Sequence, residues 1–82
     1  MLTEKGYEII LASPSEYEGL VAEIYLDGLY VATIHQERGP GLFAINFPGA
    51  GLDETRLARE VDLSGFVNAV REASARLGST GD

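Results

Sequence analysis

The sequence predicts an α+β fold in which a twisted antiparallel sheet of about four strands packs on one C-terminal helix. Its first half holds several β-prone segments separated by turn residues. The segment with the clearest helical periodicity stands near the C-terminus. All connections between the β-prone segments are short, so the strands are expected to pair antiparallel, because parallel crossovers need about a dozen residues or more. The expected order of elements is ββββα.

The size and composition of the chain fit one domain over residues 1–82. Apolar residues make up 45% of the sequence, and three phenylalanines and four tyrosines are among the larger side chains, which is ample for a core. Cysteine is absent, which excludes disulfides, thiolate catalysis and zinc thiolate sites and fits a reducing cytoplasm. Residues 1–5 and 79–82 are expected to be frayed.

The charge of the chain is strongly negative. Thirteen acidic residues against six basic ones give a net charge of −7, of which residues 1–50 contribute −5. This field would repel nucleic acid phosphates, so direct DNA or RNA binding is not expected. The N-terminus lacks the pattern of a secretory signal and no segment has the length of a membrane span, so a cytoplasmic protein without membrane contact is expected. Net charge of this size is also typical of small domains that use it for solubility.

The first elements are a strand and a turn. Residues 7–12 (YEIILA) form a short β-prone run that ends at Ser13 and Pro14, and they predict the first strand. Ser13, Pro14 and Glu16 together form a capping-box pattern. This pattern predicts one helical turn that leads the chain toward the second strand.

The strongest local pattern is a β-hairpin. Residues 20–26 and 29–36 flank Asp27 and Gly28, a pair that suits a type I′ turn and fixes Leu26 opposite Leu29. Continuing this register pairs alternate residues on alternate faces of the sheet. One face, the better core, would carry Leu20, Ala22, Ile24, Leu26, Leu29, Val31, Thr33 and His35. The other face would carry Val21, Glu23, Tyr25, Tyr30, Ala32 and Ile34.

The next segments complete the sheet. Residues 37–41 have the composition of a loop, and residues 42–47 (LFAINF) predict a further strand that is stopped by Pro48 and Gly49. Residues 48–56 have no clear period and are expected to form a surface loop. Residues 57–61 could add a short strand or lead into the helix, and the second interpretation is preferred.

The helix has recognisable ends. Asp62 can cap its start, Val61 and Phe66 are spaced for a hydrophobic staple, and Gly78 is a natural stop after Leu77. Its apolar residues recur at the spacing of one helical face. This stripe consists of Leu63, Phe66, Val67, Val70, Ala73, Ser74 and Leu77.

No group of residues predicts catalysis or metal binding. His35 is the only histidine and is expected to be hydrogen bonded or solvated at the sheet margin. Residues 39–41 (GPG) lack the lysine of a phosphate-binding loop and open into a strand. The acidic pairs 53–54 and 60 with 62 lack the spacing of a calcium loop. A non-enzymatic protein with no cofactor and no metal site is therefore expected.

One helix of about 15 residues can cover only one face of a four-stranded sheet. In the predicted register the other face displays aromatic and aliphatic side chains around Glu23, which is typical of a protein interface. Half-exposed tyrosines are also common on antiparallel sheets without a partner. The residues predicted to contact a partner are Val21, Glu23, Tyr25, Tyr30, Ile34 and Glu37.

Four segments carry a resemblance to a known class of proteins. Residues 20–28 (LVAEIYLDG), 30–32 (YVA), 36–37 (QE) and 45–49 (INFPG) resemble small bacterial proteins of the toxin-immunity type, including contact-dependent growth inhibition immunity proteins. These segments lie within residues 20–49, a span of about a third of the chain, and the resemblance carries no functional residues over. It implies a cytoplasmic protein that binds and blocks a toxin, and an acidic inhibitor suits a basic toxin or nuclease.

Two other functions remain open at this point. The chain could be a homodimeric structural or interaction protein that associates through the same sheet face or through an edge strand. It could also be a small-ligand carrier or an accessory subunit of an enzyme, which would depend on His35 and the loop at residues 39–41.

Overall fold

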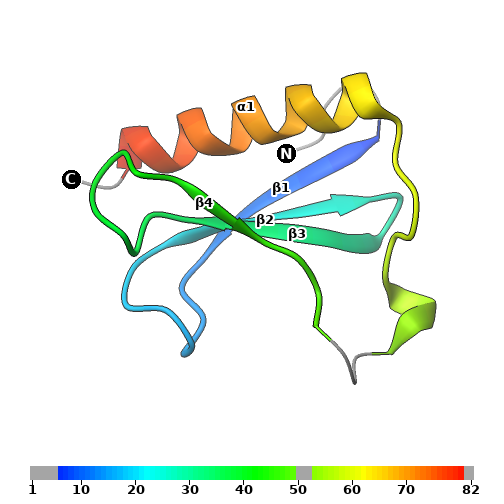
Figure 1. Ribbon diagram of the computed structural model, residues 1–82, viewed down its shortest axis with the longest axis horizontal. Coiled ribbons are helices and arrows are strands. Elements are labelled where there is room, and N and C mark those ends of the chain that lie inside the picture. Colours follow the sequence, from blue (N-terminus) through cyan, green and yellow to red (C-terminus); the bar gives the residue numbers. More distant parts are fainter. Residues whose placement is uncertain (1–5, 50–52, 81–82) are drawn as a thin grey trace.

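The computed structural model describes residues 6–49 and 53–80. Within them, four strands form one antiparallel sheet in the order β1-β2-β3-β4, and one helix crosses one face of this sheet (Figure 1). The elements are β1 (Tyr7–Ala12), β2 (Val21–Leu26), β3 (Leu29–His35), β4 (Ala44–Asn46), a short 3₁₀ helix η1 (Glu54–Arg56) and α1 (Leu63–Thr80). The predicted α+β class and ββββα order are confirmed, although β4 is shorter than predicted. The predicted fraying of residues 1–5 and 81–82 lies outside the described residues.

The β2–β3 turn has the predicted geometry. Asp27 and Gly28 both have positive φ angles, 52° and 83°, as a type I′ turn requires. Glycine tolerates such an angle without strain, and aspartate is among the few other residues that adopt it. The turn sets Leu26 opposite Leu29 and Tyr25 opposite Tyr30, as predicted.

The register changes beyond that point because β3 contains a bulge. Ile24 pairs with Ala32 rather than with Val31, and Ala22 pairs with Ile34. Since one extra residue moves every later side chain to the other face, Ala32 and Ile34 face α1. Thr33 and His35 face away from it. The predicted placement of Ile34 on the uncovered face, and of Thr33 and His35 in the core, is wrong.

The core lies between the sheet and the helix. The strands contribute the larger side chains, including Ile9, Ile24 and Ile34, and α1 contributes small ones at the closest contact. The buried residues of this core are Tyr7, Ile9, Ala22, Ile24, Val31, Ala32, Ile34, Ala69, Ala73 and Leu77.

The helix is rotated relative to the predicted stripe. Ala69, which the stripe omitted, is fully buried, whereas Leu63 and Val67 are 76% and 39% exposed. Small side chains let the helix axis approach the sheet, so the line through Ala69 and Ala73 makes the contact. Leu63 and Val67 are therefore turned away from the sheet, whereas Leu77 is buried and Phe66 and Val70 pack against the core, as the stripe predicted.

The ends of α1 agree only partly with the prediction. Asp62 caps the start, because its Oδ2 accepts a hydrogen bond from the Gly65 amide at 2.8 Å. Val61 and Phe66 pack together against the core, as a hydrophobic staple does. The predicted stop at Gly78 is wrong, because α1 continues to Thr80. Gly78 lies beside Phe43, since a Cβ at this position would be 3.4 Å from the Phe43 ring, an ordinary van der Waals contact.

Of two further connections, one differs from the prediction and one agrees with it. The capping-box segment forms a tight turn in which the Tyr17 amide donates to the Pro14 carbonyl at 3.2 Å, and not the predicted helical turn. Residues 57–61 lead into α1 as preferred, with a single bridge between Leu57 and Tyr30.

The buried Tyr7 joins β1 to the start of α1. Its hydroxyl donates to the Asp62 carbonyl oxygen at 3.3 Å and to Asp62 Oδ1 at 3.2 Å. Burial, followed by the hydrogen bond to Asp62, raises the pKa of Tyr7 from 10.0 to about 12. Tyr7 therefore retains its proton in the folded protein at pH values where the unfolded chain loses it.

We expect Tyr7→Phe to lower the free energy of unfolding by about 1 kcal/mol near neutral pH, because the hydrogen bonds to Asp62 are lost. The stabilising contribution of Tyr7 is fully present below pH 10.0 and declines as the pH rises toward about 12. The difference between wild type and variant should therefore narrow over this range. Urea unfolding at a series of alkaline pH values measures the free energy of unfolding of both proteins. A difference between them that does not change with pH would contradict the prediction.

Candidate partner-binding face

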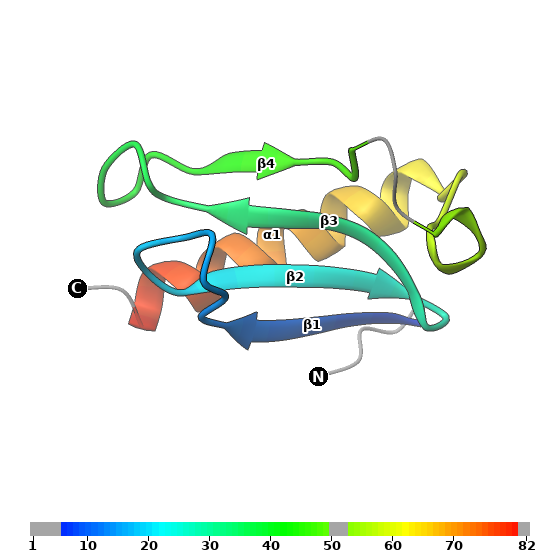
Figure 2. The same cartoon turned by 90° about the horizontal axis from the view of Figure 1, so that it is seen from below.

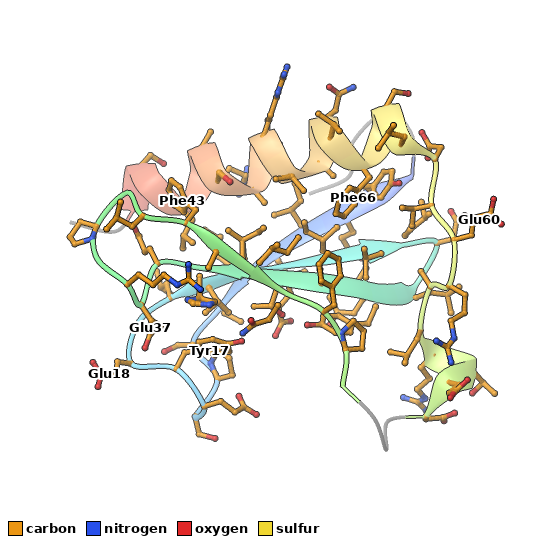
Figure 3. All side chains as sticks on the ribbon, viewed as in Figure 1. Tyr17, Glu18, Glu37, Phe43, Glu60 and Phe66 are labelled. Carbon is orange, nitrogen blue, oxygen red and sulfur yellow. The ribbon has the colours of Figure 1, made fainter. Side chains whose placement is uncertain are left out.

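The face of the sheet turned away from α1 is partly covered by the loop between β1 and β2, residues 13–20 (Figure 2). Tyr17, Glu18 and Glu37 lie on this side, whereas Phe43 and Phe66 lie on the helix side (Figure 3). We call the side away from α1 the acidic face. Val21 belongs to it by alternation but is fully buried. Its predicted partner contact is therefore wrong, as is that of Ile34 in the core.

Glu37 holds the β1–β2 loop in place through two hydrogen bonds. Its Oε1 accepts a hydrogen bond from the Glu18 amide at 3.0 Å, and its Oε2 accepts one from the Gly19 amide at 3.2 Å. Hydrogen bonds to a carboxylate are stronger than those between neutral groups. The structure thus gives Glu37, predicted as a partner contact, a role in holding the loop over the sheet.

His35 lies beneath this loop. Its ring is 5.3 Å from the ring of Tyr17, and its Nδ1 accepts a hydrogen bond from the Glu37 amide at 3.1 Å. Tyr17 is held in turn by Asn46, whose Nδ2 donates to the tyrosine hydroxyl at 2.7 Å. The prediction of a hydrogen-bonded histidine is confirmed. Among residues 6–49 and 53–80, no group of three or more His, Cys, Asp or Glu side chains could hold a metal ion.

Three of the predicted contact residues are brought together on the acidic face. Tyr25 and Tyr30 have ring centroids 5.6 Å apart, and the Tyr25 hydroxyl donates to Glu23 Oε1 at 3.1 Å. Burial is the main cause that raises the pKa of Tyr25, followed by the charge of Glu23. The hydroxyls of Tyr30 and Thr33 are hydrogen bonded to each other. Fixed tyrosines beside a carboxylate offer a rigid surface with both apolar and polar contacts.

A groove of about 420 Å³ runs between Tyr30, the β1–β2 loop and the end of β4. Sequence patterns did not identify its loop wall, although the segment 16–18 (EYE) places an aromatic ring between two acids. The residues that line the groove are Pro14, Glu16, Tyr17, Glu23, Tyr30, Thr33, Asn46, Phe47, Pro48 and Gly49.

The charges of β1, β2, β3 and their connections have one sign, and the first basic residue after them is Arg38. Residues 7–37, which form β1, β2, β3 and their connections, contain six carboxylates and no lysine or arginine. Arg56 and Arg59 lie beyond the sheet and pair with Asp53 and Glu54 of their own loop. Carboxylates without basic neighbours produce a negative potential over the face they occupy.

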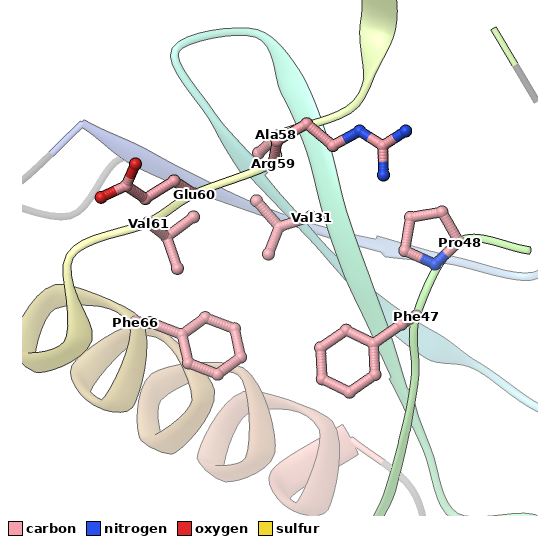
Figure 4. Close-up of a pocket in the computed structure, with 8 residues that line it drawn as sticks. All are labelled: Val31, Phe47, Pro48, Ala58, Arg59, Glu60, Val61 and Phe66. Atoms are coloured by element: carbon pink, nitrogen blue, oxygen red, sulfur yellow. The ribbon is translucent and has the colours of Figure 1, made fainter. Parts of the chain in front are cut away.

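A second surface lies between α1 and β4. A hollow of about 210 Å³ separates Phe47 from Phe66 there, with Val31 and Val61 nearby (Figure 4). Phe47, which lines the hollow, is 63% exposed, and Leu63 at the start of α1 is 76% exposed. We call this surface the α1–β4 strip, and it consists of Leu42, Phe43, Phe47, Leu63 and Val67. The sequence placed Leu63 and Val67 on the helix stripe expected to pack on the sheet, and the other three residues in the strand predicted at residues 42–47.

Comparison of the chain with protein-family models, with curated proteins and with solved structures found no match. In the part of the chain that the structure describes, no helix has both the length and the apolar character needed to cross a membrane. The function is therefore argued from the two surfaces of the chain itself.

Proposed function

We propose that the protein is a non-enzymatic binding module whose acidic face binds a basic protein, as a toxin-immunity inhibitor binds its toxin. The observation that carries this proposal is a sheet face with a tyrosine pair and a groove, in a segment with six carboxylates and no lysine or arginine. A surface of one sign accelerates encounter with a partner of opposite charge and disfavours like-charged partners.

The chemistry of the face suits a nuclease or another protein that binds phosphate. Such proteins present basic residues where the nucleic acid backbone would lie. The side chains of Glu16 and Glu23 can occupy such a surface, while Tyr25 and Tyr30 supply contact area at a small cost in side-chain entropy. Binding there would block the partner without any chemical step.

Affinity capture from the native cell lysate tests the proposal. Tagged protein should retain a basic protein at low salt and release it as the salt concentration rises, because exposed charges are screened. The double variant Glu16→Gln/Glu23→Gln should bind this partner at least about tenfold more weakly, since both changes remove charge from the groove. Glu72→Gln, on α1 across the molecule, removes one charge elsewhere and should have little effect. Equal retention by the double variant, or recovery of no basic protein, would contradict the proposal.

Self-association is a second candidate function, and the exposed apolar α1–β4 strip is the observation that favours it. Two copies could cover the strip of each other in a symmetric dimer. Sedimentation over a range of concentrations should then show a dimer for wild type and a monomer for Leu63→Ser/Val67→Ser. The exposed Ala75→Ser on the same helix is the matched control. A wild-type monomer at the highest concentration would exclude this candidate.

A further inference from the structure

We infer that the groove on the acidic face receives an arginine side chain of the protein partner. This inference rests on the proposed function and names the contact that anchors the partner. It concerns the chemistry of a cavity with aromatic and carboxylate walls, and not the net charge of the chain alone.

Three parts of the chain form the walls of the groove, and each contributes an aromatic ring. Tyr17 comes from the β1–β2 loop, Tyr30 from β3, and Phe47 from the residue that follows β4. The loop and β2 each add a carboxylate, from Glu16 and Glu23. The antiparallel order of the sheet brings these parts together, although 31 positions separate Glu16 from Phe47.

The two carboxylates retain acceptor capacity. Within residues 6–49 and 53–80, Glu16 makes no hydrogen bond and no ion pair. Glu23 accepts a hydrogen bond from Tyr25 through Oε1, and in the same segments its Oε2 accepts none. A carboxylate that is not paired within its own chain is available to an incoming cation. Among the residues that the structure describes, no lysine or arginine lines the groove to compete for it.

Aromatic rings and carboxylates in one cavity favour a cation over a neutral or negative ligand. A cation is attracted to the face of an aromatic ring, and this attraction strengthens when water is excluded. The planar guanidinium group of arginine can stack on a ring while it donates paired hydrogen bonds to a carboxylate. Lysine has a compact, strongly hydrated ammonium group and cannot do both in the same way. The groove therefore suits arginine better than lysine.

The environment of Tyr30 supports a negative potential inside the groove. Burial is the largest cause that raises the pKa of this tyrosine; the hydrogen bond to Thr33 lowers it, and the charges of Tyr17, Glu23 and Glu16 raise it in smaller amounts. Both carboxylates thus act on the same hydroxyl from different parts of the chain. The hydrogen bond to Thr33 keeps that hydroxyl in place, so the ring of Tyr30 is a fixed wall.

Titration of the isotope-labelled protein with N-acetyl-arginine amide, followed by NMR, tests the inference. Amide shifts should concentrate at Glu16, Tyr17, Glu23, Tyr30 and Phe47, with saturation in the millimolar range expected of a single side chain. The citrulline analogue has a similar shape without charge and should bind at least about tenfold more weakly. The double variant Glu16→Gln/Glu23→Gln should weaken binding of the arginine analogue to a similar degree, whereas Glu72→Gln should leave this binding unchanged.

Other outcomes would overturn the inference. Shifts spread over the whole chain, or equal binding of citrulline amide, would mean that no guanidinium site exists. A lysine or polyamine analogue that binds as tightly as arginine would mean a site for cations in general. The proposed function fails separately: if a basic partner is captured through the acidic face but arginine amide gives no local shifts, only the anchor is wrong. If arginine amide binds but no basic protein is captured, only the proposed function is wrong.

Discussion

Replacing Ile24 with alanine should lower the free energy of unfolding by about 3 kcal/mol. Ile24 is fully buried in β2, an interior strand of the sheet, and pairs with Ile9 on one side and Ala32 on the other. Truncation removes apolar contacts and leaves a cavity beneath α1, because strands held on both sides cannot collapse around it. A domain of this size has a total stability of only about 4–12 kcal/mol, so the loss would be a large share of it.

Urea unfolding followed by circular dichroism measures this effect. Ile10→Ala is a matched control, because Ile10 lies on β1, an edge strand of the described sheet, and is 39% exposed. It should cost less than about 1 kcal/mol with the same dependence on urea. A similar loss in both variants would mean that the core is not centred between β2 and α1.

The sequence predicted the fold class because its local patterns and its global arrangement agree. The turn at Asp27 and Gly28 defines its own geometry, the short connections require antiparallel neighbours, and Asp62 caps the helix. Each of these features depends on residues that are close in the sequence. They were predicted correctly for that reason.

The errors arise where packing between distant segments decides the outcome. The bulge at Val31 has no sequence marker, since Val31 suits a regular strand as well. As a consequence, Ile34 faces α1, whereas Thr33 and His35 lie on the acidic face, which is the reverse of the predicted placement. The rotation of α1 likewise depends on how closely Ala69 and Ala73 fit the sheet, and apolar periodicity does not measure that fit.

The bulge also determines the site. Because it turns Thr33 and His35 to the acidic face, Thr33 can bind the hydroxyl of Tyr30, and His35 can support Tyr17. Without the extra residue, Ile34 would occupy that face. Glu23, Tyr25 and Tyr30 could be predicted because they precede or flank the bulge, whereas Tyr17 reaches the site from a loop without periodicity.

Replacing Glu37 with alanine should release the β1–β2 loop from the sheet. The variant loses both acceptors of the Glu18 and Gly19 amides, which lie 19 and 18 positions earlier in the chain, respectively. Two charge-assisted hydrogen bonds at an exposed position are worth about 2 kcal/mol together. Exchange of these two amides with solvent deuterium, measured by NMR, should therefore accelerate by about 30-fold. The strands beneath should keep their protection, because their ladder does not involve Glu37.

Glu18→Ala is the control for this experiment, since it also removes one negative charge but keeps the Glu37 carboxylate and both amides. Glu37 does not line the groove, but its carboxylate holds the loop that carries Glu16 and Tyr17, which do. Loss of this carboxylate should therefore also lower the affinity of the protein for arginine amide. Accelerated exchange in both variants would attribute the loop's order to charge rather than to the two hydrogen bonds. Unchanged exchange in Glu37→Ala would mean that the contact between Tyr17 and His35 is enough to hold the loop over the sheet.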